Sequence, residues 1–276
     1  MRSFFAFSIL IVFFYSSCKG DKQPVNTDSI SASGTKAPAD SAAVLIAPSP
    51  LQSISVIRQL QHKADYRLLS DINIETGSFT TEYRKALLLG VIITDAAYSG
   101  IAGNYNLASG YFKKGEKLIR ELKLESSGLK YFSKFNETIR NKDSLAFHLL
   151  SFYNDIQQEL NSGKREKTGL ALMTGAMVES MTLSLADSTL YKNEMLLQLA
   201  GQQKIWVNNL LTAVTYLPNE EETQDMYNTL YTFSYFFEPV TASVVNKKSV
   251  VVAPPDALKK LNSKATQIRE EILRTK

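Results

Sequence analysis

Hydrophobic side chains recur at helical spacing along most of the chain after residue 50. The strongest run begins after Thr80 or Thr81, either of which can cap a helix, and it continues to about Ser99. After Ala86 the run is apolar nearly all round, which is typical of a helix that is buried on every side. The pattern therefore predicts a central helix here.

The same spacing predicts further helices, separated by residues that commonly end helices. The expected ranges are 104–122, 127–140, 143–160, 165–185, 188–217 and 220–237. A weaker segment around Ile57 and Leu60 precedes them. After Pro254 and Pro255 a last amphipathic helix begins, which either docks on the others or stands free. Its apolar positions are Leu258, Leu261, Ile268 and Ile272.

Only one segment favours strands. Two valine-rich stretches, 244–245 and 250–252, flank residues 246–249 and are compatible with a small hairpin or with a loop lying on the helices. The sequence therefore predicts an all-α fold, an irregular antiparallel helical bundle. We expect the bundle to span 51–240, and the hairpin or loop and the last helix to occupy 241–276.

The start of the chain follows a different pattern. A basic residue, Arg2, precedes an apolar run at 4–15, and two serines then lead to Cys18. These are the parts of a secretory signal, and the run is shorter than the roughly 20 residues that span a bilayer. Ser-Ser-Cys resembles a lipobox, although Tyr15 stands where an aliphatic residue is preferred. Because Cys18 is the only cysteine, we predict a lipoprotein signal peptide at 1–17 and lipidation of Cys18. An ordinary signal peptide with an incidental cysteine is the alternative.

Residues 18–50 are rich in Ser, Ala, Asp, Thr, Pro and Gly. Such a segment buries too little apolar surface to offset its conformational entropy, so we expect a disordered tether behind the lipid. Lys19 follows the cysteine, where an aspartate would favour retention in the inner membrane. The expected location is therefore the outer membrane, on either face, with the acyl chains on Cys18 as the attachment.

Charge and motif content narrow the possible functions. The net charge is +4 and the charges are interspersed, so nucleic acid is not an expected partner. The two histidines, His62 and His148, lack the spacing of metal ligands, so neither a metal site nor a cofactor is expected. Gly110–Lys117 departs from a phosphate-binding loop by placing Glu116 after the second glycine. No recognisable catalytic motif remains, which favours a protein without enzymatic activity.

Two acidic residues lie within apolar helical segments. Asp95 follows Val91–Thr94, and Glu179 falls on the packed side of its predicted helix. An unpaired buried carboxylate is costly, so each is expected to be paired, hydrogen-bonded, protonated or directed at a cavity. The sequence leaves open a structural polar contact, which we favour, and a functional pocket. The partners considered are Arg140, Lys142, Gln203 and Tyr98.

Tyr227, Tyr231 and Tyr235 form an aromatic stripe with a spacing of four residues. Such stripes belong to the core in most helical proteins, and in the others they line a pocket or contact a partner. We therefore predict that these tyrosines are mainly core residues.

Four short motifs resemble a family of uncharacterised all-helical lipoproteins of Bacteroidetes, and the resemblance spans about residues 66–218. The motifs are Lys85–Val91, Asp95–Tyr98, Lys142–Leu145 and Gly175–Glu179. The corresponding acids recur in that family, which makes Asp95, Asp143 and Glu179 candidates for a site. The possible pocket then consists of Asp95, Tyr98, Asp143, Glu179 and Gln203. The resemblance implies no activity.

Two functional hypotheses follow. The first is a membrane-anchored envelope lipoprotein that acts as a binding or scaffolding module for an envelope protein. The second is a small-ligand-binding protein or enzyme that uses the buried carboxylates of the bundle.

Overall fold

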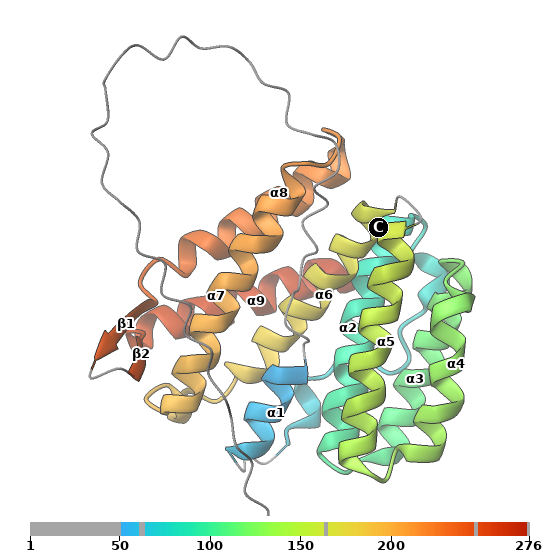
Figure 1. The fold of residues 1–276 in the computed structure, drawn as a ribbon, viewed down its shortest axis with the longest axis horizontal. Helices are drawn as coiled ribbons and strands as arrows, with labels where there is room; N and C mark the ends of the chain where they lie inside the picture. The colour runs from blue at the N-terminus through green and yellow to red at the C-terminus, as the bar shows by residue number, and fades with distance from the viewer. Residues whose placement is uncertain (1–50, 61–63, 163–164, 246–247, 275–276) are drawn as a thin grey trace, which may run out of the picture. The chain divides into compact units, whose positions relative to one another are not determined.

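The computed structural model describes residues 51–60, 64–162, 165–245 and 248–274. Cys18, the predicted signal peptide and the predicted tether lie outside the described residues. The described chain is almost entirely helical, with one small sheet (Figure 1). The all-α prediction is therefore confirmed. The α-helices are α1 (Leu51–Gln59), α2 (Glu82–Ile101), α3 (Tyr105–Glu121), α4 (Glu125–Thr138), α5 (Lys142–Ser162), α6 (Glu166–Ser184), α7 (Glu194–Val214), α8 (Glu221–Phe236) and α9 (Pro255–Leu273).

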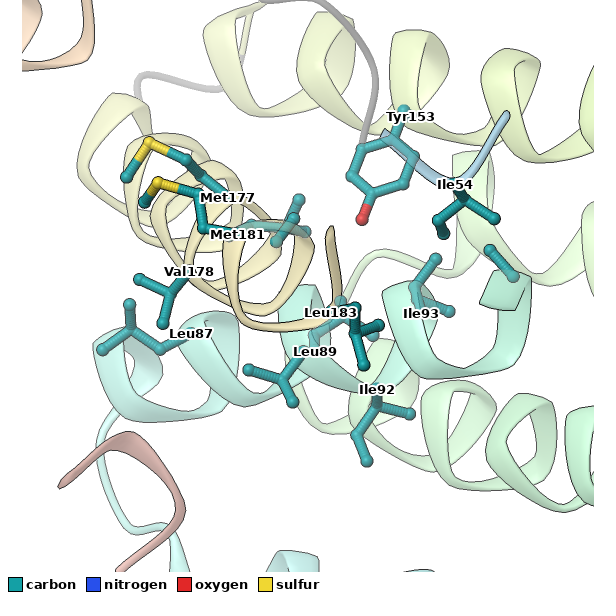
Figure 2. Packing of buried hydrophobic residues seen from close by; sticks show 14 of the residues in the cluster. Ile54, Leu87, Leu89, Ile92, Ile93, Tyr153, Met177, Val178, Met181 and Leu183 are labelled. Atoms are coloured by element: carbon teal, nitrogen blue, oxygen red, sulfur yellow. The ribbon is translucent and has the colours of Figure 1, made fainter. Parts of the chain in front are cut away.

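Helices α2 and α6 form the centre of the bundle. Every residue of α2 from Ala86 to Ile101 is buried, as the apolar run predicts, and α6 is almost as fully enclosed. Leu87 of α2 and Val178 of α6 belong to this core (Figure 2). The two helices contact each other through glycine: a Cβ on Gly90 would lie 2.2 Å from the carbonyl oxygen of Leu172. Only glycine permits so close a backbone approach.

Two groups of helices pack around this pair. Helices α3, α4 and α5 gather beside α2, while α7 and α8 lie beyond α6 (Figure 1). The first group is held by aromatic packing, in which Phe112 stacks on Phe135 with ring centroids 4.3 Å apart and Phe152 contacts Phe135 edge-on. Offset and edge-on aromatic pairs add stability beyond the area that they bury.

The last helix, α9, docks on the bundle, which decides between the two alternatives left open by the sequence. Its apolar residues Leu258, Leu261 and Ala265 are fully buried, and α9 packs against α6, α8 and α2. Arg84 at the start of α2 donates a hydrogen bond of 3.1 Å to the carbonyl oxygen of Ile272. This bond satisfies one of the carbonyls that a helix end leaves free.

The valine-rich segment forms a hairpin, of strands β1 (Thr241–Val245) and β2 (Lys248–Val252). The strands are antiparallel, with Thr241 opposite Val252 and Val245 opposite Lys248. The second strand thus begins two residues earlier than the valine pattern indicates. Val251 packs on Gly201 of α7, where a Cβ would lie 2.9 Å from the valine side chain.

Capping residues mark the starts of α2 and α7, although α7 begins later than the sequence predicts. Thr81 caps α2 by accepting from the N–H of Arg84, and Gly103, with φ of +91°, reverses the chain after that helix. The helix expected from residue 188 instead begins at Glu194. Residues Ser188–Leu190 form a separate 3-10 turn, and Asn193 accepts hydrogen bonds from the first amides of α7. Because Asn is a favourable N-cap residue, Asn193 favours a new helix start over continuation of the 3-10 turn.

Candidate functional site

Asp95 lies on α2 with no exposed surface, and its carboxylate is held by the segment before that helix. Its Oδ2 accepts a hydrogen bond of 3.0 Å from the amide of Ser70 and a second bond from the hydroxyl of Ser70. Tyr111 of α3 donates its hydroxyl proton to the carbonyl oxygen of Ser70. The chain at Ser70 is thereby fixed against both helices.

Glu179 lies on α6 and is also fully buried. Its Oε2 accepts a hydrogen bond from Nε of Arg269 on α9, whose residue surface is only 9% exposed. Glu179 also lies beside Asp95, and each carboxyl group shifts the pKa of the other. Three charged side chains from α2, α6 and α9 therefore form one buried group, which we call the acid–arginine cluster (Asp95, Glu179 and Arg269).

The glycine contact explains why the two acids meet. Gly90 and Gly175 bring the backbones of α2 and α6 together, since a Cβ on Gly175 would lie 2.1 Å from the carbonyl oxygen of Leu87. Asp95 and Glu179 follow these glycines by about one helical turn on each helix. Both side chains thus leave the helices near the point of closest approach.

Burial controls the acidity of the cluster. It raises the pKa of Asp95, and this shift is opposed by the interaction with Glu179, by the charge of Arg269 and by the bonds from Ser70. Burial, followed by the neighbouring charge of Asp95, raises the pKa of Glu179 well above its ordinary value, and Arg269 opposes that shift. Burial would lower the pKa of Arg269, but the charges of both acids outweigh it and the pKa is raised. Arg269 therefore stays cationic, while the acids favour protonation.

The other predicted site residues have separate environments. The hydroxyl oxygen of Tyr98 accepts a hydrogen bond of 3.1 Å from the amide of Asp65. Gln203 on α7 donates to the hydroxyls of Ser53 and Ser184, at 3.3 Å and 3.4 Å, and so links α7 to α1 and α6. The side chain of Asp143 lies outside the described residues. The structure therefore joins Asp95 to Glu179 and gives Tyr98 and Gln203 different partners.

The residue that pairs with the buried acids, Arg269, is not among the four partners considered from the sequence. Arg140, which was considered as the cationic partner, is exposed, and Arg269 is the cation that bonds to Glu179. The sequence does contain a signal, because Arg269 lies four residues after Ala265 and three before Ile272, both on the apolar face of α9. An arginine on the buried face of an amphipathic helix requires a buried acid.

The tyrosine stripe, which was expected in the core, lies at the surface. Tyr231 is 57% exposed and Tyr235 61%, and Tyr227 is half-buried with its ring stacked on that of Tyr231 at 6.0 Å. The prediction is wrong because α8 carries a second apolar stripe that faces inward and is buried: Met226, Leu230, Phe233 and Phe237. We call Tyr227, Tyr231 and Tyr235 the tyrosine face.

Comparison with known proteins adds no function to this picture. No protein-family model, curated protein or solved structure matches the chain.

Within the described ranges no three histidine, cysteine, aspartate or glutamate side chains are arranged to hold a metal ion. No helix in those ranges combines the length and apolarity needed to cross a membrane. Functional arguments therefore depend on the residues of this chain alone.

Proposed function

We propose that the protein is an envelope lipoprotein, anchored at the outer membrane through acyl chains on Cys18, whose helical domain is a binding or scaffolding module. The sequence of the first fifty residues supports the anchor. The exposed tyrosine face is the observation that supports binding. Its proposed partner is a protein of the cell envelope.

The chemistry of the tyrosine face suits a protein contact. Tyrosine is enriched at the centres of interfaces because its ring buries a large area while its hydroxyl forms a hydrogen bond. Tyr231 and Tyr235 lie on one side of α8, and the exposed polar side chains of Gln224 and Asn228 continue that side. The neighbouring helix α7 is joined at this level by a hydrogen bond of 2.9 Å from Ser234 to Asn208. An exposed aromatic strip with polar residues beside it is typical of a surface that binds a partner protein.

The buried acids support a structural role more than catalysis. Neither Asp95 nor Glu179 has any exposed surface, and each already bonds to Ser70 or Arg269. A substrate would reach them only after the elements that cover them had moved away. The alternative hypothesis, a ligand-binding protein or enzyme built on these carboxyls, would require that opening.

Photocrosslinking in cells tests the binding proposal. A crosslinking amino acid is placed at Tyr235 and, as the matched control, at Phe147 of α5, an aromatic residue that is 65% exposed. We expect a discrete adduct with one envelope protein from position 235, and none from position 147. The same adduct should weaken when Tyr231→Ala is added. Equal labelling from both positions, or none from position 235, would contradict the proposal.

Replacement of Cys18 tests the anchor. The Cys18→Ser variant should lose labelling by a radioactive fatty acid and should leave the membrane fraction, because no other cysteine can be acylated. Cys18→Ser with unchanged membrane association would contradict lipid anchoring.

A further inference from the structure

The acid–arginine cluster contains two carboxyl groups and one guanidinium, all buried. If both acids were ionised, the cluster would carry one uncompensated negative charge away from water. A buried unpaired charge is among the most costly arrangements in a protein. A single proton on either acid makes the cluster electrically neutral.

A hydrogen bond between the two neighbouring acids would require the same proton. Ser70 donates a hydrogen bond to Oδ2 of Asp95, and Arg269 donates one to Oε2 of Glu179. The other oxygens, Oδ1 and Oε1, are buried and receive no bond from an N–H or hydroxyl donor among the described residues. Two ionised carboxylates offer only acceptors, so a hydrogen bond between them needs one protonated partner.

We propose that Asp95 and Glu179 share one proton at neutral pH and that this proton holds helix α9 on the bundle. Arg269 is the part of α9 that enters the cluster, and α9 packs on both helices that carry the acids. Loss of the proton leaves a second carboxylate without a counter-charge. Undocking of α9 would hydrate it, because α9 carries Arg269 into the cluster and packs on both α2 and α6.

Charged and titratable groups around the acids support this assignment. Arg269 faces them from α9 and Tyr111 from α3, and burial together with the charge of Asp95 raises the pKa of Tyr111. On the α5 side the phenol of Tyr153 is fully buried, and burial raises its pKa. Both tyrosines are neutral in the physiological range, so Arg269 is the cation that balances the pair. The raised pKa of Glu179 agrees with an acid that retains a proton.

The direction of the pH effect follows from linkage. An acid whose pKa is raised on folding binds more protons in the folded state, so stability falls as pH rises from its unfolded pKa to its folded pKa. For one proton, the equilibrium constant for opening rises by at most about tenfold per pH unit in that window. We therefore expect α9 to open more often in alkaline solution than in mildly acidic solution.

Infrared spectroscopy of the full chain gives the first test. At neutral pH the protein should show the carbonyl band of a protonated buried carboxyl group, which shifts in heavy water. The band should disappear in Glu179→Gln and in Asp95→Asn, because either amide leaves one carboxylate opposite Arg269 with no proton to share. Glu116→Gln, on an exposed i,i+4 pair with Arg120, should leave the band intact. Its absence in the unaltered protein would overturn the proposal.

Limited proteolysis gives the second test, since trypsin can cut at Lys264 once α9 opens. From neutral to alkaline pH the cleavage rate should rise in the unaltered protein more steeply than in Glu179→Gln, whose amide donates to Asp95 at every pH. The ratio of the two rates removes the pH dependence of trypsin itself. Should Glu179→Gln fail to fold, Asp95→Asn provides the same comparison. Identical pH dependence in the unaltered protein and the variant would overturn the proposal.

Discussion

Gly90 and Gly175 face each other across the contact between α2 and α6, and each meets the backbone of the opposite helix. A Cβ on Gly90 would lie 2.2 Å from the carbonyl oxygen of Leu172, and one on Gly175 would lie 2.1 Å from that of Leu87. Backbone atoms cannot turn away as a flexible side chain can. The separation of the two central helices, and with it the contact between Asp95 and Glu179, is therefore set by these glycines.

Gly90→Ala and Gly175→Ala are expected to reduce the free energy of unfolding by about 3 kcal/mol each, at the upper end of the usual range for overpacking. The helices must separate to admit the methyl group, which also stretches the cluster. Urea unfolding followed by circular dichroism measures the loss. Gly77→Ala is the control, because no atom lies within 4 Å of a Cβ at that position. Equal stability of the control and the two central variants would contradict this account.

Amide variants of the two acids are expected to be strongly non-additive. Glu179→Gln or Asp95→Asn alone leaves one carboxylate opposite Arg269, so each should change the free energy of unfolding by less than about 1 kcal/mol at neutral pH. The double variant leaves the guanidinium buried without an anion and should lose about 3–5 kcal/mol. A double-mutant cycle from urea unfolding gives the coupling energy. Two single losses that simply sum to the double loss would argue against a shared proton.

Removal of the cation should have an effect that depends on pH. Arg269→Met leaves two buried carboxyls, which need a second proton, so a loss of about 3–5 kcal/mol is expected at about pH 7.5. Both acids have pKa values that burial raises, so the folded state binds the extra proton as the pH falls. Part of the loss should therefore be recovered at about pH 5. The matched control is Arg120→Met, which removes the cation of an exposed pair with Glu116; its small effect should not change between these pH values.

The helices and the two acids could be predicted from the sequence because both signals are local. Asp95 and Glu179 are recognisable from their apolar neighbours on the same helix. Arg269 could not be assigned in the same way, because it meets Glu179 across 90 residues of chain and the docking of α9 was undecided. The tyrosine face was misassigned for a related reason. Helix α8 carries both the tyrosine face and a second apolar stripe, and its packing against α6, α7 and α9 determines which of them turns inward.

The two faces of α8 should respond differently to truncation. Phe233→Ala should cost about 3–5 kcal/mol, because its ring has no exposed surface and leaves a cavity. Tyr235→Ala should change stability by less than about 0.5 kcal/mol, as expected for an exposed position. Thermal unfolding of the two variants measures the difference. A large loss from Tyr235→Ala would show that the tyrosine face is part of the fold and not available to a partner.

The start of α7 depends on one capping residue. Asn193 accepts from the amides of Met195 at 2.9 Å and Leu196 at 3.4 Å, so Asn193→Ala should reduce the free energy of unfolding by about 1 kcal/mol. Chemical unfolding provides the measurement. Asn209→Ala, at an exposed position within the same helix, should have little effect. A loss from Asn209→Ala as large as that from Asn193→Ala would contradict the capping role.

The separation of 90 residues between Glu179 and Arg269 affects when the centre of the bundle can fold. During synthesis α2 and α6 emerge well before α9, so both acids are made before the cation that neutralises them. The nascent chain would have to hold the acids in water, and the centre of the bundle could not close until α9 had left the ribosome. For a chain exported as we propose, this delay is useful. A precursor whose bundle stays open until α9 has been made can still pass unfolded through a translocation channel.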